Sequence, residues 1–138
     1  MGDGRRFDAF ADLIARNIAP QMSIADVAGG NGGLRAALYR RGVRNVDTWD
    51  KRKRNAKGRA GYVNRLFDWQ TAPRYECLVS MHGDSASDHV IGSAIKHRVP
   101  FILCPCCVMP SAFKFSGNQY EPWVEHLAAI ARFGGMQV

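Results

Sequence analysis

The stretch IADVAGGNGGLRAAL, residues 24 to 38, is the most informative part of the chain for its fold. It joins a short apolar run to a helical pattern through four glycines in five positions, Gly29, Gly30, Gly32 and Gly33. Glycine weakens regular structure and suits places where another group approaches the backbone closely. The stretch predicts a buried strand, a glycine turn and a helix. Three interpretations of the turn are open: it binds a nucleotide phosphate, it binds another nucleoside ligand, or it is only a tight turn.

On both sides of this stretch, strand-like and helix-like segments alternate. Apolar residues recur every three or four positions where helices are expected, at residues 6–18, 33–41, 85–98 and 121–133. Short apolar runs predict strands at residues 23–29, 45–50, 62–67, 75–82 and 100–107. This alternation predicts an α/β fold with a mainly parallel sheet and helices on both faces. Ligands of such sheets bind beyond the carboxyl ends of the strands, so the residues that follow each strand are the candidate site.

The length, charge and apolar content of the chain limit its domain number, its partners and its location. The 138 residues are expected to form one domain, residues 1–138, which is large enough to bury a hydrophobic core. The net charge is +7, which favours an anionic partner, nucleic acid first, although a basic surface without a partner stays open. The start of the chain lacks the apolar stretch of a signal peptide, and no window approaches the ~18 apolar residues of a membrane span. We therefore expect a cytoplasmic protein that does not enter a membrane.

Three of the four cysteines lie close together, as Cys104, Cys106 and Cys107. Zinc sites usually combine two separated C-x2-C pairs, and here only Cys77 is left to form a second pair. No metal site is expected. Two interpretations remain for the cluster: apolar thiols that end a buried strand beside the ligand, or a reactive thiol.

The glycine turn fits one nucleotide-binding pattern better than another. A dinucleotide fingerprint, G-x-G-x-x-G, started at Gly30 has Arg35 in place of its third glycine. The pattern D-x-x-x-G-x-G, started at Asp26, is complete. It resembles motif I of the class I S-adenosylmethionine-dependent methyltransferases, and the resemblance implies a Rossmann-like sheet that binds S-adenosylmethionine. The implied cofactor loop consists of Asp26, Ala28, Gly29, Gly30, Asn31 and Gly32.

Acidic residues follow the next two predicted strands. A carboxylate at Asp50 can accept hydrogen bonds from both ribose hydroxyls of a nucleoside, and the resemblance implies that role for it, with Lys51 beside it. By the same resemblance Asp68 holds the adenine amino group, and Phe67 or Trp69 presses on the adenine ring. The alternatives are that Asp50 only caps its strand and that Asp68 lies in a turn beside two core aromatic residues.

A narrower resemblance covers SMHGDSASDHV, residues 80–90, together with the cysteine pair downstream. The segment is similar to the H-x-C-G-x-A-T-D motif of a methyltransferase branch that includes the tRNA ribose 2′-O-methyltransferases of the acceptor stem. It departs from that motif at residues 84, 85 and 87. The matching positions are His82, Gly83, Ala86, Asp88, Cys106 and Cys107.

This second resemblance implies RNA as the substrate and places His82 and Asp84 at the methyl acceptor. A neutral histidine can take the proton of a ribose hydroxyl, or it can simply position that hydroxyl. Asp88 and Cys106 are implied on the substrate side, although Asp88 in a first helical turn is alternatively an electrostatic cap.

The run KRKRNAKGR, residues 51–59, holds six Lys and Arg directly after Asp50. A charge run is often only a solvated face, but a loop at the carboxyl edge of the sheet borders the predicted cofactor site. We expect Arg52, Lys53 and Arg54 to contact RNA phosphates without reading the base sequence.

Class I methyltransferases usually end in an antiparallel β6–β7 hairpin, and no segment after residue 133 corresponds to it. We expect an exposed sheet edge that a second copy of the chain, or a partner subunit, covers. The expected function is S-adenosylmethionine-dependent methyl transfer to RNA. Two alternatives stay open: methyl transfer to a small molecule or protein, and a non-catalytic module that binds nucleic acid or a partner.

Overall fold

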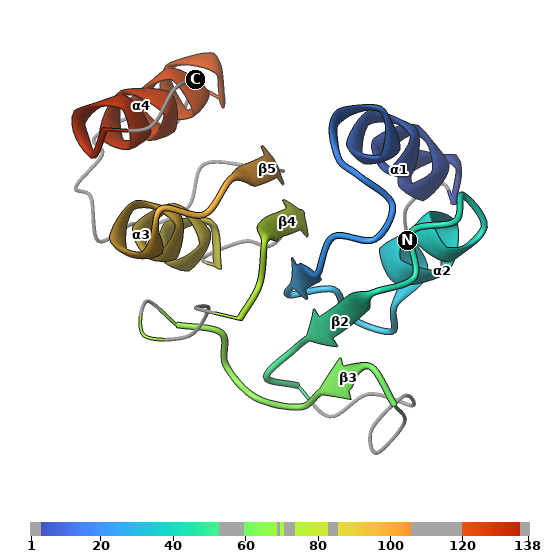
Figure 1. The fold of residues 1–138 in the computed structure, drawn as a ribbon. Coiled ribbons are helices and arrows are strands. Elements are labelled where there is room, and N and C mark those ends of the chain that lie inside the picture. Colours follow the sequence, from blue (N-terminus) through green and yellow to red (C-terminus); the bar gives the residue numbers. More distant parts are fainter. Residues whose placement is uncertain are drawn as a thin grey trace.

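Five parallel strands form one sheet in the order β3-β2-β1-β4-β5 (Figure 1). The structure is a computed structural model that describes residues 4–52, 60–68, 70, 74–82, 86–105 and 120–135. The strands are β1 (Ile24–Val27), β2 (Val46–Trp49), β3 (Tyr62–Val63), β4 (Cys77–Met81) and β5 (Phe101–Cys104). The helices are α1 (Arg5–Asn17), α2 (Gly33–Tyr39), α3 (Ala86–His97) and α4 (Tyr120–Phe133). The predicted α/β fold with a parallel sheet is confirmed.

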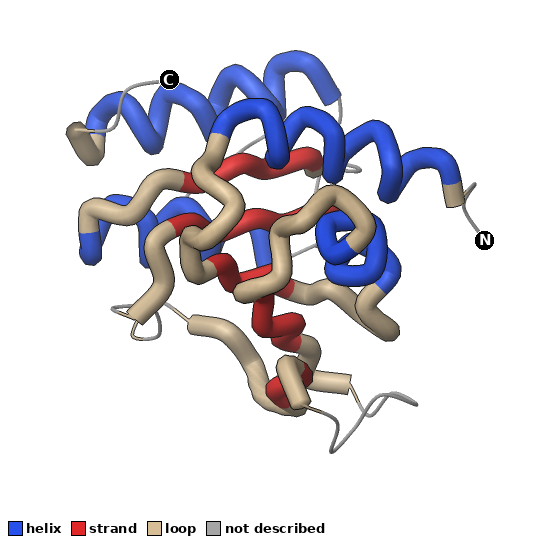
Figure 2. The backbone as a smooth tube through the Cα atoms, turned by 45° about the vertical axis from the view of Figure 1, so that its right-hand side comes forward, coloured by secondary structure: helices blue, strands red, loops and turns tan. Residues whose placement is uncertain are grey.

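Helices cover both faces of the sheet, because the side chains of each strand alternate between the faces and each face has its own core. On one face α1 and α2 pack over Ile24 and Val79. On the other face α3 covers Val27 and Leu78, and Leu127 of α4 packs against α3. Figure 1 shows the two helix pairs on opposite sides of the sheet. In Figure 2 the strands, in red, pass through the middle of the molecule.

The central strand explains why residues 24 to 27 form a strand at all. All four of its residues are buried, as expected for a parallel strand that is covered on both faces. Ile24 and Val27 supply apolar contacts to opposite faces. Asp26 is the exception, a carboxyl group with an exposed fraction of 1% in the middle of the sheet. A charged side chain is rarely buried without a specific role, which directs attention to the end of β1.

The predicted strand over 62–67 is wrong beyond Val63, where the pairing with β2 ends. The chain turns there, because the Arg65 amide donates to the Val63 carbonyl over 3.0 Å. The side-chain amide of Asn64 also donates to the Asp50 carbonyl over 3.0 Å, which pulls the chain toward the end of β2. An apolar run does not distinguish a strand from a loop that buries one aromatic ring, here Phe67. The loop lies at the carboxyl edge of the sheet and forms part of the candidate site.

The other described elements agree with the predicted segments to within a few residues at each end. Residues 106 and 107, at the end of the predicted strand 100–107, lie outside the described residues. Among the described strands, β3 and β5 are the outer ones, and a subunit covering such an edge stays a prediction. None of the described helices combines the length and apolar character that crossing a bilayer requires.

Candidate functional site

The glycine turn joins the end of β1 to the start of α2 at the carboxyl edge of the sheet. Ala28, Gly30 and Gly32 have positive φ angles of 58°, 60° and 88°. The amide of Gly29 donates to the carbonyl of Trp49 over 3.1 Å, and the amide of Gly32 donates to that of Gly29 over 3.0 Å. A positive φ at an alanine is uncommon and persists only where the surroundings hold the backbone in place. The turn therefore has a fixed shape that the end of β2 helps to set.

The protein's own packing requires three of the four glycines, because a Cβ atom there would overlap a neighbouring side chain. The pairs in contact are Gly29 with Asp26, Gly32 with Tyr62, and Gly33 with Phe7. Gly30 differs, since a Cβ atom on it would have no such neighbour within 4 Å. The groups that come close to the backbone of the turn are thus mostly side chains of the protein itself. Of the four glycines, only Gly30 faces open space.

Arg35 explains why the third glycine of a dinucleotide fingerprint is not needed here. Its Nε donates to the carbonyl of Val46 over 3.0 Å, which links α2 to β2. Its guanidinium lies 5.4 Å from the ring centroid of Tyr39 and 5.1 Å from that of Tyr62. A long side chain fills the space between helix and strand that the fingerprint glycine normally leaves for direct backbone packing.

Asp50 links the end of β2 to the glycine turn. Its Oδ2 accepts a hydrogen bond from the Gly30 amide over 2.9 Å, and its Oδ1 accepts one from the Arg52 amide over 2.8 Å. The Nε of Arg52 lies 3.4 Å from the same Oδ1. Burial alone raises the pKa of Asp50, but the hydrogen bonds from Arg52 and Gly30 outweigh it and hold that pKa below its usual value. Asp50 is therefore a carboxylate at neutral pH.

Asp26 lies beneath the turn and behaves differently from Asp50. Its Oδ2 accepts a hydrogen bond from the Thr48 hydroxyl over 3.0 Å. Burial raises the pKa of Asp26 to about 7; the Thr48 hydrogen bond opposes this rise, and the charge of Asp50 adds to it. Near neutral pH the two aspartates thus differ in charge, Asp26 being partly protonated and Asp50 ionised.

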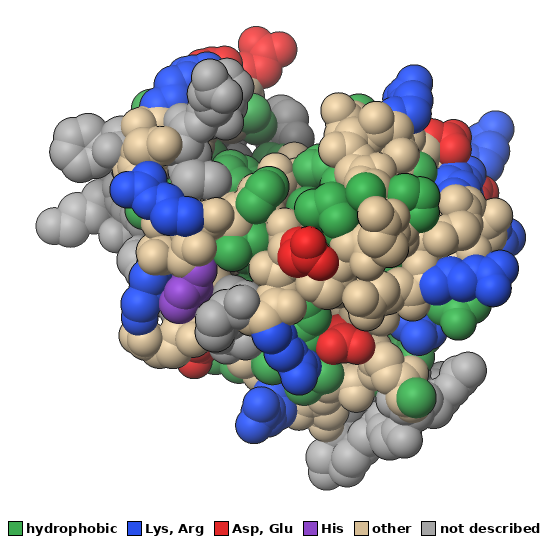
Figure 3. All heavy atoms as spheres, in the orientation of Figure 1, with side chains coloured by type: hydrophobic (Ala, Val, Ile, Leu, Met, Phe, Trp, Pro, Cys, Tyr) green, Lys and Arg blue, Asp and Glu red, His purple; other side chains and the backbone are tan. Residues whose placement is uncertain are grey.

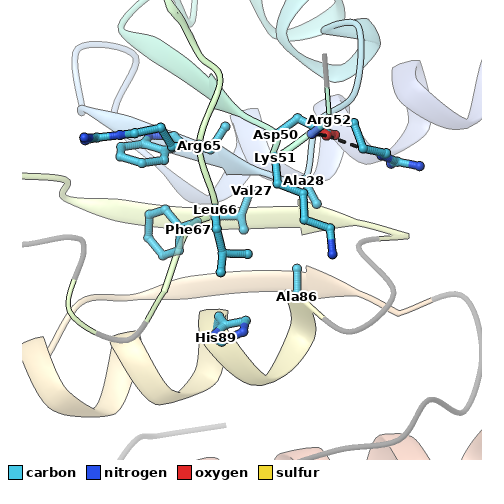
Figure 4. A pocket seen from close by; sticks show the side chains of 11 residues that line it. Val27, Ala28, Asp50, Lys51, Arg52, Arg65, Leu66, Phe67, Ala86 and His89 are labelled. Carbon is cyan, nitrogen blue, oxygen red and sulfur yellow. Dashed lines mark hydrogen bonds and ion pairs between the residues drawn. The ribbon is translucent and has the colours of Figure 1, made fainter. Parts of the chain in front are cut away.

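A pocket of about 350 Å³ opens on the face of the sheet that α3 covers, and it is named here the α3-side pocket. Figure 4 shows its side chains arriving from the ends of β1 and β2, from the loop after β3 and from α3. Leu66 is 50% exposed, whereas Phe67 is 2% exposed and packs edge-on against Trp49 with ring centroids 5.4 Å apart. Leu66 is therefore the apolar side chain that a ligand can cover. The pocket is lined by Val27, Ala28, Trp49, Asp50, Lys51, Arg52, Arg65, Leu66, Phe67, Ala86 and His89.

A second pocket, of about 370 Å³, lies against the glycine turn and is named the glycine-loop pocket. The guanidinium of Arg6 in its wall lies 4.8 Å from the ring centroid of Phe7, and the Arg6 Nε is buried without a hydrogen-bond partner among the described residues. Both pockets fall in the range of roughly 300–1,000 Å³ that small-molecule sites occupy. This one is lined by Arg6, Phe7, Asp26, Ala28, Gly29, Gly30, Asn31, Gly33, Leu34, Arg52, Met81 and His82.

The two pockets adjoin at the ends of β1 and β2. Ala28 and Arg52 line both of them. Asp50 lines the α3-side pocket and Gly30 lines the glycine-loop pocket, so their hydrogen bond crosses from one to the other. The site can hold an elongated ligand with an apolar ring at one end and a polar chain at the other.

His82 lies directly after β4, in the wall of the glycine-loop pocket. Its φ angle is 54°, and its amide donates to the carbonyl of Cys104 over 2.8 Å. The paired strand β5 thus holds His82 in an uncommon backbone conformation. Such conformations concentrate at functional sites, which makes His82 a candidate on geometry as well as on sequence.

The structure brings together most of the described residues that the sequence predicts for the site. Asp26, Ala28, Gly29, Gly30, Asn31 and His82 share the glycine-loop pocket, Asp50, Lys51 and Phe67 line the α3-side pocket, and Arg52 lines both. Gly32 instead faces the ring of Tyr62. Five other predicted residues, Lys53, Arg54, Trp69, Asp84 and Cys106, lie outside the described residues.

Asp68 and Asp88 lie outside the walls of both pockets. Oδ1 of Asp68 accepts a hydrogen bond from the Gln70 amide over 2.9 Å, within its own turn. Asp88 is buried in the first turn of α3, with an exposed fraction of 7%. Their predicted contacts with adenine and substrate remain predictions.

The sequence did not predict every residue of the pocket walls, and Arg6 and His89 are two that it missed. Arg6 precedes the apolar stripe of its helix, and His89 lies one position after the predicted motif. The spacing of apolar residues in a helix predicts which side chains share a face of that helix. It does not predict which of them meet a pocket whose other walls come from separate strands and loops. No sequence signal identified them.

The described thiols are poor candidates for reactivity. Burial raises the pKa of Cys77 to about 11 and raises that of Cys104. Both are therefore thiols near neutral pH, which favours the apolar interpretation for these two. Within the described ranges, no three His, Cys, Asp or Glu side chains cluster as metal ligands would.

The Lys and Arg side chains among the described residues are spread out rather than gathered in one patch on the face that Figure 3 shows. Figure 3 shows Lys and Arg side chains along several margins of the face that Figure 1 presents. Lys51, Arg52 and Arg65 are exposed and line the α3-side pocket. These are the described cations that an anionic partner reaches beside the candidate site.

Comparison with models of known protein families gave no match, and comparison with curated protein sequences likewise gave none.

Proposed function

We propose that this protein is a class I S-adenosylmethionine-dependent methyltransferase that acts on RNA. The observation that carries the proposal is the hydrogen bond from the Gly30 amide to Asp50, at the place where the two pockets adjoin. It sets an ionised carboxylate between a cavity with an apolar wall, at Leu66 and Ala86, and the glycine turn. A nucleoside joined to a polar chain needs an apolar surface, a carboxylate and a polar turn in that order.

The strand order supports a Rossmann-like interpretation. From β1 the chain proceeds outward to β2 and β3 on one side, and then crosses to β4 and β5 on the other. Ligands of open parallel sheets bind in the crevice at this reversal, beyond the carboxyl ends of the strands. The ends of β1, β2 and β4 supply Ala28, Asp50 and His82 to the candidate site.

The residues present fit S-adenosylmethionine. Each oxygen of Asp50 has two lone pairs, and the amides of Gly30 and Arg52 use one on each oxygen. The remaining acceptor capacity suits two ribose hydroxyls, once the long 3.4 Å contact from the Arg52 side chain is displaced. Leu66 and Ala86 give the α3-side pocket an apolar surface for a heterocycle, and the guanidinium of Arg6 suits a carboxylate in the other pocket.

The chain's own residues would perform the acceptor chemistry. When bound, S-adenosylmethionine supplies a methyl group on a positively charged sulfur; transfer to a ribose hydroxyl breaks the C–S bond, forms a C–O bond and releases one proton. An imidazole nitrogen of His82 takes that proton, and the backbone hydrogen bond to β5 fixes the position of residue 82 in the wall of the glycine-loop pocket. Lys51 and Arg65 hold phosphates of the RNA at the rim of the site.

Calorimetry with S-adenosylmethionine and S-adenosylhomocysteine tests cofactor binding. Asp50→Asn retains an oxygen for the Gly30 amide but loses the charge, so we expect about a tenfold loss of affinity. Asp47→Asn is the matched control, since Asp47 lies on the same strand and bonds Tyr75 instead of lining a pocket. Absence of binding to the wild-type protein would overturn the proposal.

Transfer of a tritiated methyl group to total RNA, DNA and protein then identifies the substrate class. Label in RNA is the expected result. Label in DNA or in protein would replace RNA with that substrate class. Binding of S-adenosylmethionine without methyl transfer to RNA, DNA or protein would favour a binding module that keeps the fold but catalyses no reaction.

A further inference from the structure

The α3-side pocket contains one polar side chain that neither the fold nor the proposed cofactor contacts explain. Asp50 bonds the glycine turn, and Lys51, Arg52 and Arg65 are exposed cations. His89 instead comes from α3, and Figure 4 shows its ring across the pocket from Asp50 and Arg52, with Leu66 and Ala86 between.

The imidazole of His89 has unused hydrogen-bonding capacity. Its Nδ1 is shut off from solvent and has no hydrogen-bond partner among the described residues. Buried polar atoms are nearly always partnered, so an exception calls for an explanation. The bond made by one ring nitrogen normally decides which nitrogen carries the proton. Nδ1 itself is out of reach of a ligand in the pocket. Because no described group bonds Nδ1, the proton can occupy either ring nitrogen, so Nε2 can accept a hydrogen bond from a ligand or donate one to it.

Asp68 is the residue that the sequence pattern assigns to the base. It lies outside the pocket walls, and its Oδ1 accepts the Gln70 amide over 2.9 Å. A heterocycle in the α3-side pocket would meet Leu66 as an apolar surface and His89 as the polar group on the far wall.

We infer that His89 makes the hydrogen bond that selects the purine of the bound nucleoside, in place of Asp68. This inference rests on the proposed function, since it names the specificity residue of the same site. His89 distinguishes a base that carries a hydrogen-bonding exocyclic group from one that carries only a hydrogen atom at that position. It is a binding residue and takes no part in methyl transfer.

The test compares two probes by calorimetry: S-adenosylhomocysteine, and its purine analogue, in which a hydrogen atom replaces the exocyclic amino group. Wild-type protein should prefer the adenine probe by about tenfold, the worth of one good hydrogen bond. His89→Ala and His89→Phe should both bring this preference close to unity. The Phe variant preserves the ring volume, so it reports the loss of the nitrogens if the Ala variant fails to fold.

Two variants serve as controls. Asp68→Ala should keep the full preference, and so should His97→Ala, in the last turn of the same helix. A preference that survives both His89 changes, that disappears in Asp68→Ala, or that is absent from the wild-type protein would overturn the inference while leaving cofactor binding intact. If the wild-type protein binds neither probe, the proposed function itself fails.

Discussion

The amide of Gly30 donates a hydrogen bond to Oδ2 of Asp50 over 2.9 Å, between residues 20 positions apart in the sequence. The contact joins the turn after β1 to the end of β2, so the shape of the glycine turn and the position of the carboxylate are set together. A change at either residue is expected to alter ligand binding before it alters the fold.

The two glycines beside this contact should respond differently to substitution. Gly29→Ala places a methyl group against the buried Asp26 carboxyl and should lower the free energy of unfolding by about 1–3 kcal/mol, as overpacking does. Gly30→Asn has open space and a residue that tolerates positive φ, so it should cost under about 1 kcal/mol. Urea denaturation measures both.

Calorimetry on the Gly30→Asn variant tests whether the ligand binds over Gly30. Gly30→Asn fills space in the glycine-loop pocket and should weaken S-adenosylhomocysteine binding by about tenfold or more. Unchanged affinity in a folded Gly30→Asn protein would show that the ligand does not lie over Gly30.

Because of Asp26, the free energy of unfolding should fall as pH rises toward neutrality. Burial raises its folded-state pKa to about 7, whereas the unfolded value is about 4. Between these values the folded state keeps a proton that the unfolded state has released, so the free energy of unfolding falls as pH rises. The stabilisation that the protonated Asp26 gives is fully present below about pH 4 and is lost by about pH 7. Between these values it falls by ~1.4 kcal/mol per pH unit.

The variant Asp26→Asn isolates this effect, because it cannot titrate and its oxygen can still accept the Thr48 hydroxyl. From pH 5 to pH 7 the wild-type protein should lose roughly 2–3 kcal/mol relative to the variant, measured by urea denaturation at both values. Parallel pH profiles would mean that Asp26 titrates near its ordinary pKa.

His82 should affect methyl transfer and leave cofactor binding nearly unchanged. His82→Asn suits the φ angle of 54° and removes the imidazole, so it should lower kcat by roughly 10²–10⁴ if His82 takes the proton. The affinity for S-adenosylhomocysteine should change by less than about threefold. A rate loss below about tenfold would leave His82 only a positioning role.

Lys51 and Arg65 should contribute to RNA binding through phosphate contacts. The double variant Lys51→Ala/Arg65→Ala should weaken binding of a single-stranded RNA and reduce the slope of log K against log salt by roughly 1.4. Arg16→Ala/Arg132→Ala is the matched control, since it removes the same charge from the last turns of α1 and α4. Equal effects of the two double variants would mean that net charge, and not the edge of the site, governs binding.

Much of the site follows from local sequence. The pattern from Ile24 to Leu38 is local: apolar residues, then glycines, then a helical period, and each acts on the few residues beside it. The positions of Asp26 and Asp50 at the ends of β1 and β2 follow from the same reasoning, because parallel strands end at one edge of the sheet.

The course of the chain after β3 did not follow from the sequence. The apolar run to Phe67 predicts a longer strand, but Asn64 bonds the carbonyl of Asp50, 14 positions away, and turns the chain. That turn exposes Leu66 and leaves Asp68 outside the pocket. A contact between distant residues outweighed a local preference, and local patterns carry no information about it.

The sequence by itself determined the strand–turn–helix unit, the parallel α/β class and the acidic strand ends, because these depend on periodicity and on backbone preferences of neighbouring residues. Only the tertiary structure decided that three of the four glycines accommodate Asp26, Tyr62 and Phe7, while Gly30 alone stays open. It also decided that Arg6 and His89 line the pockets. The physical reason is that a pocket wall consists of side chains from separate elements, and their meeting is fixed by packing across the sheet.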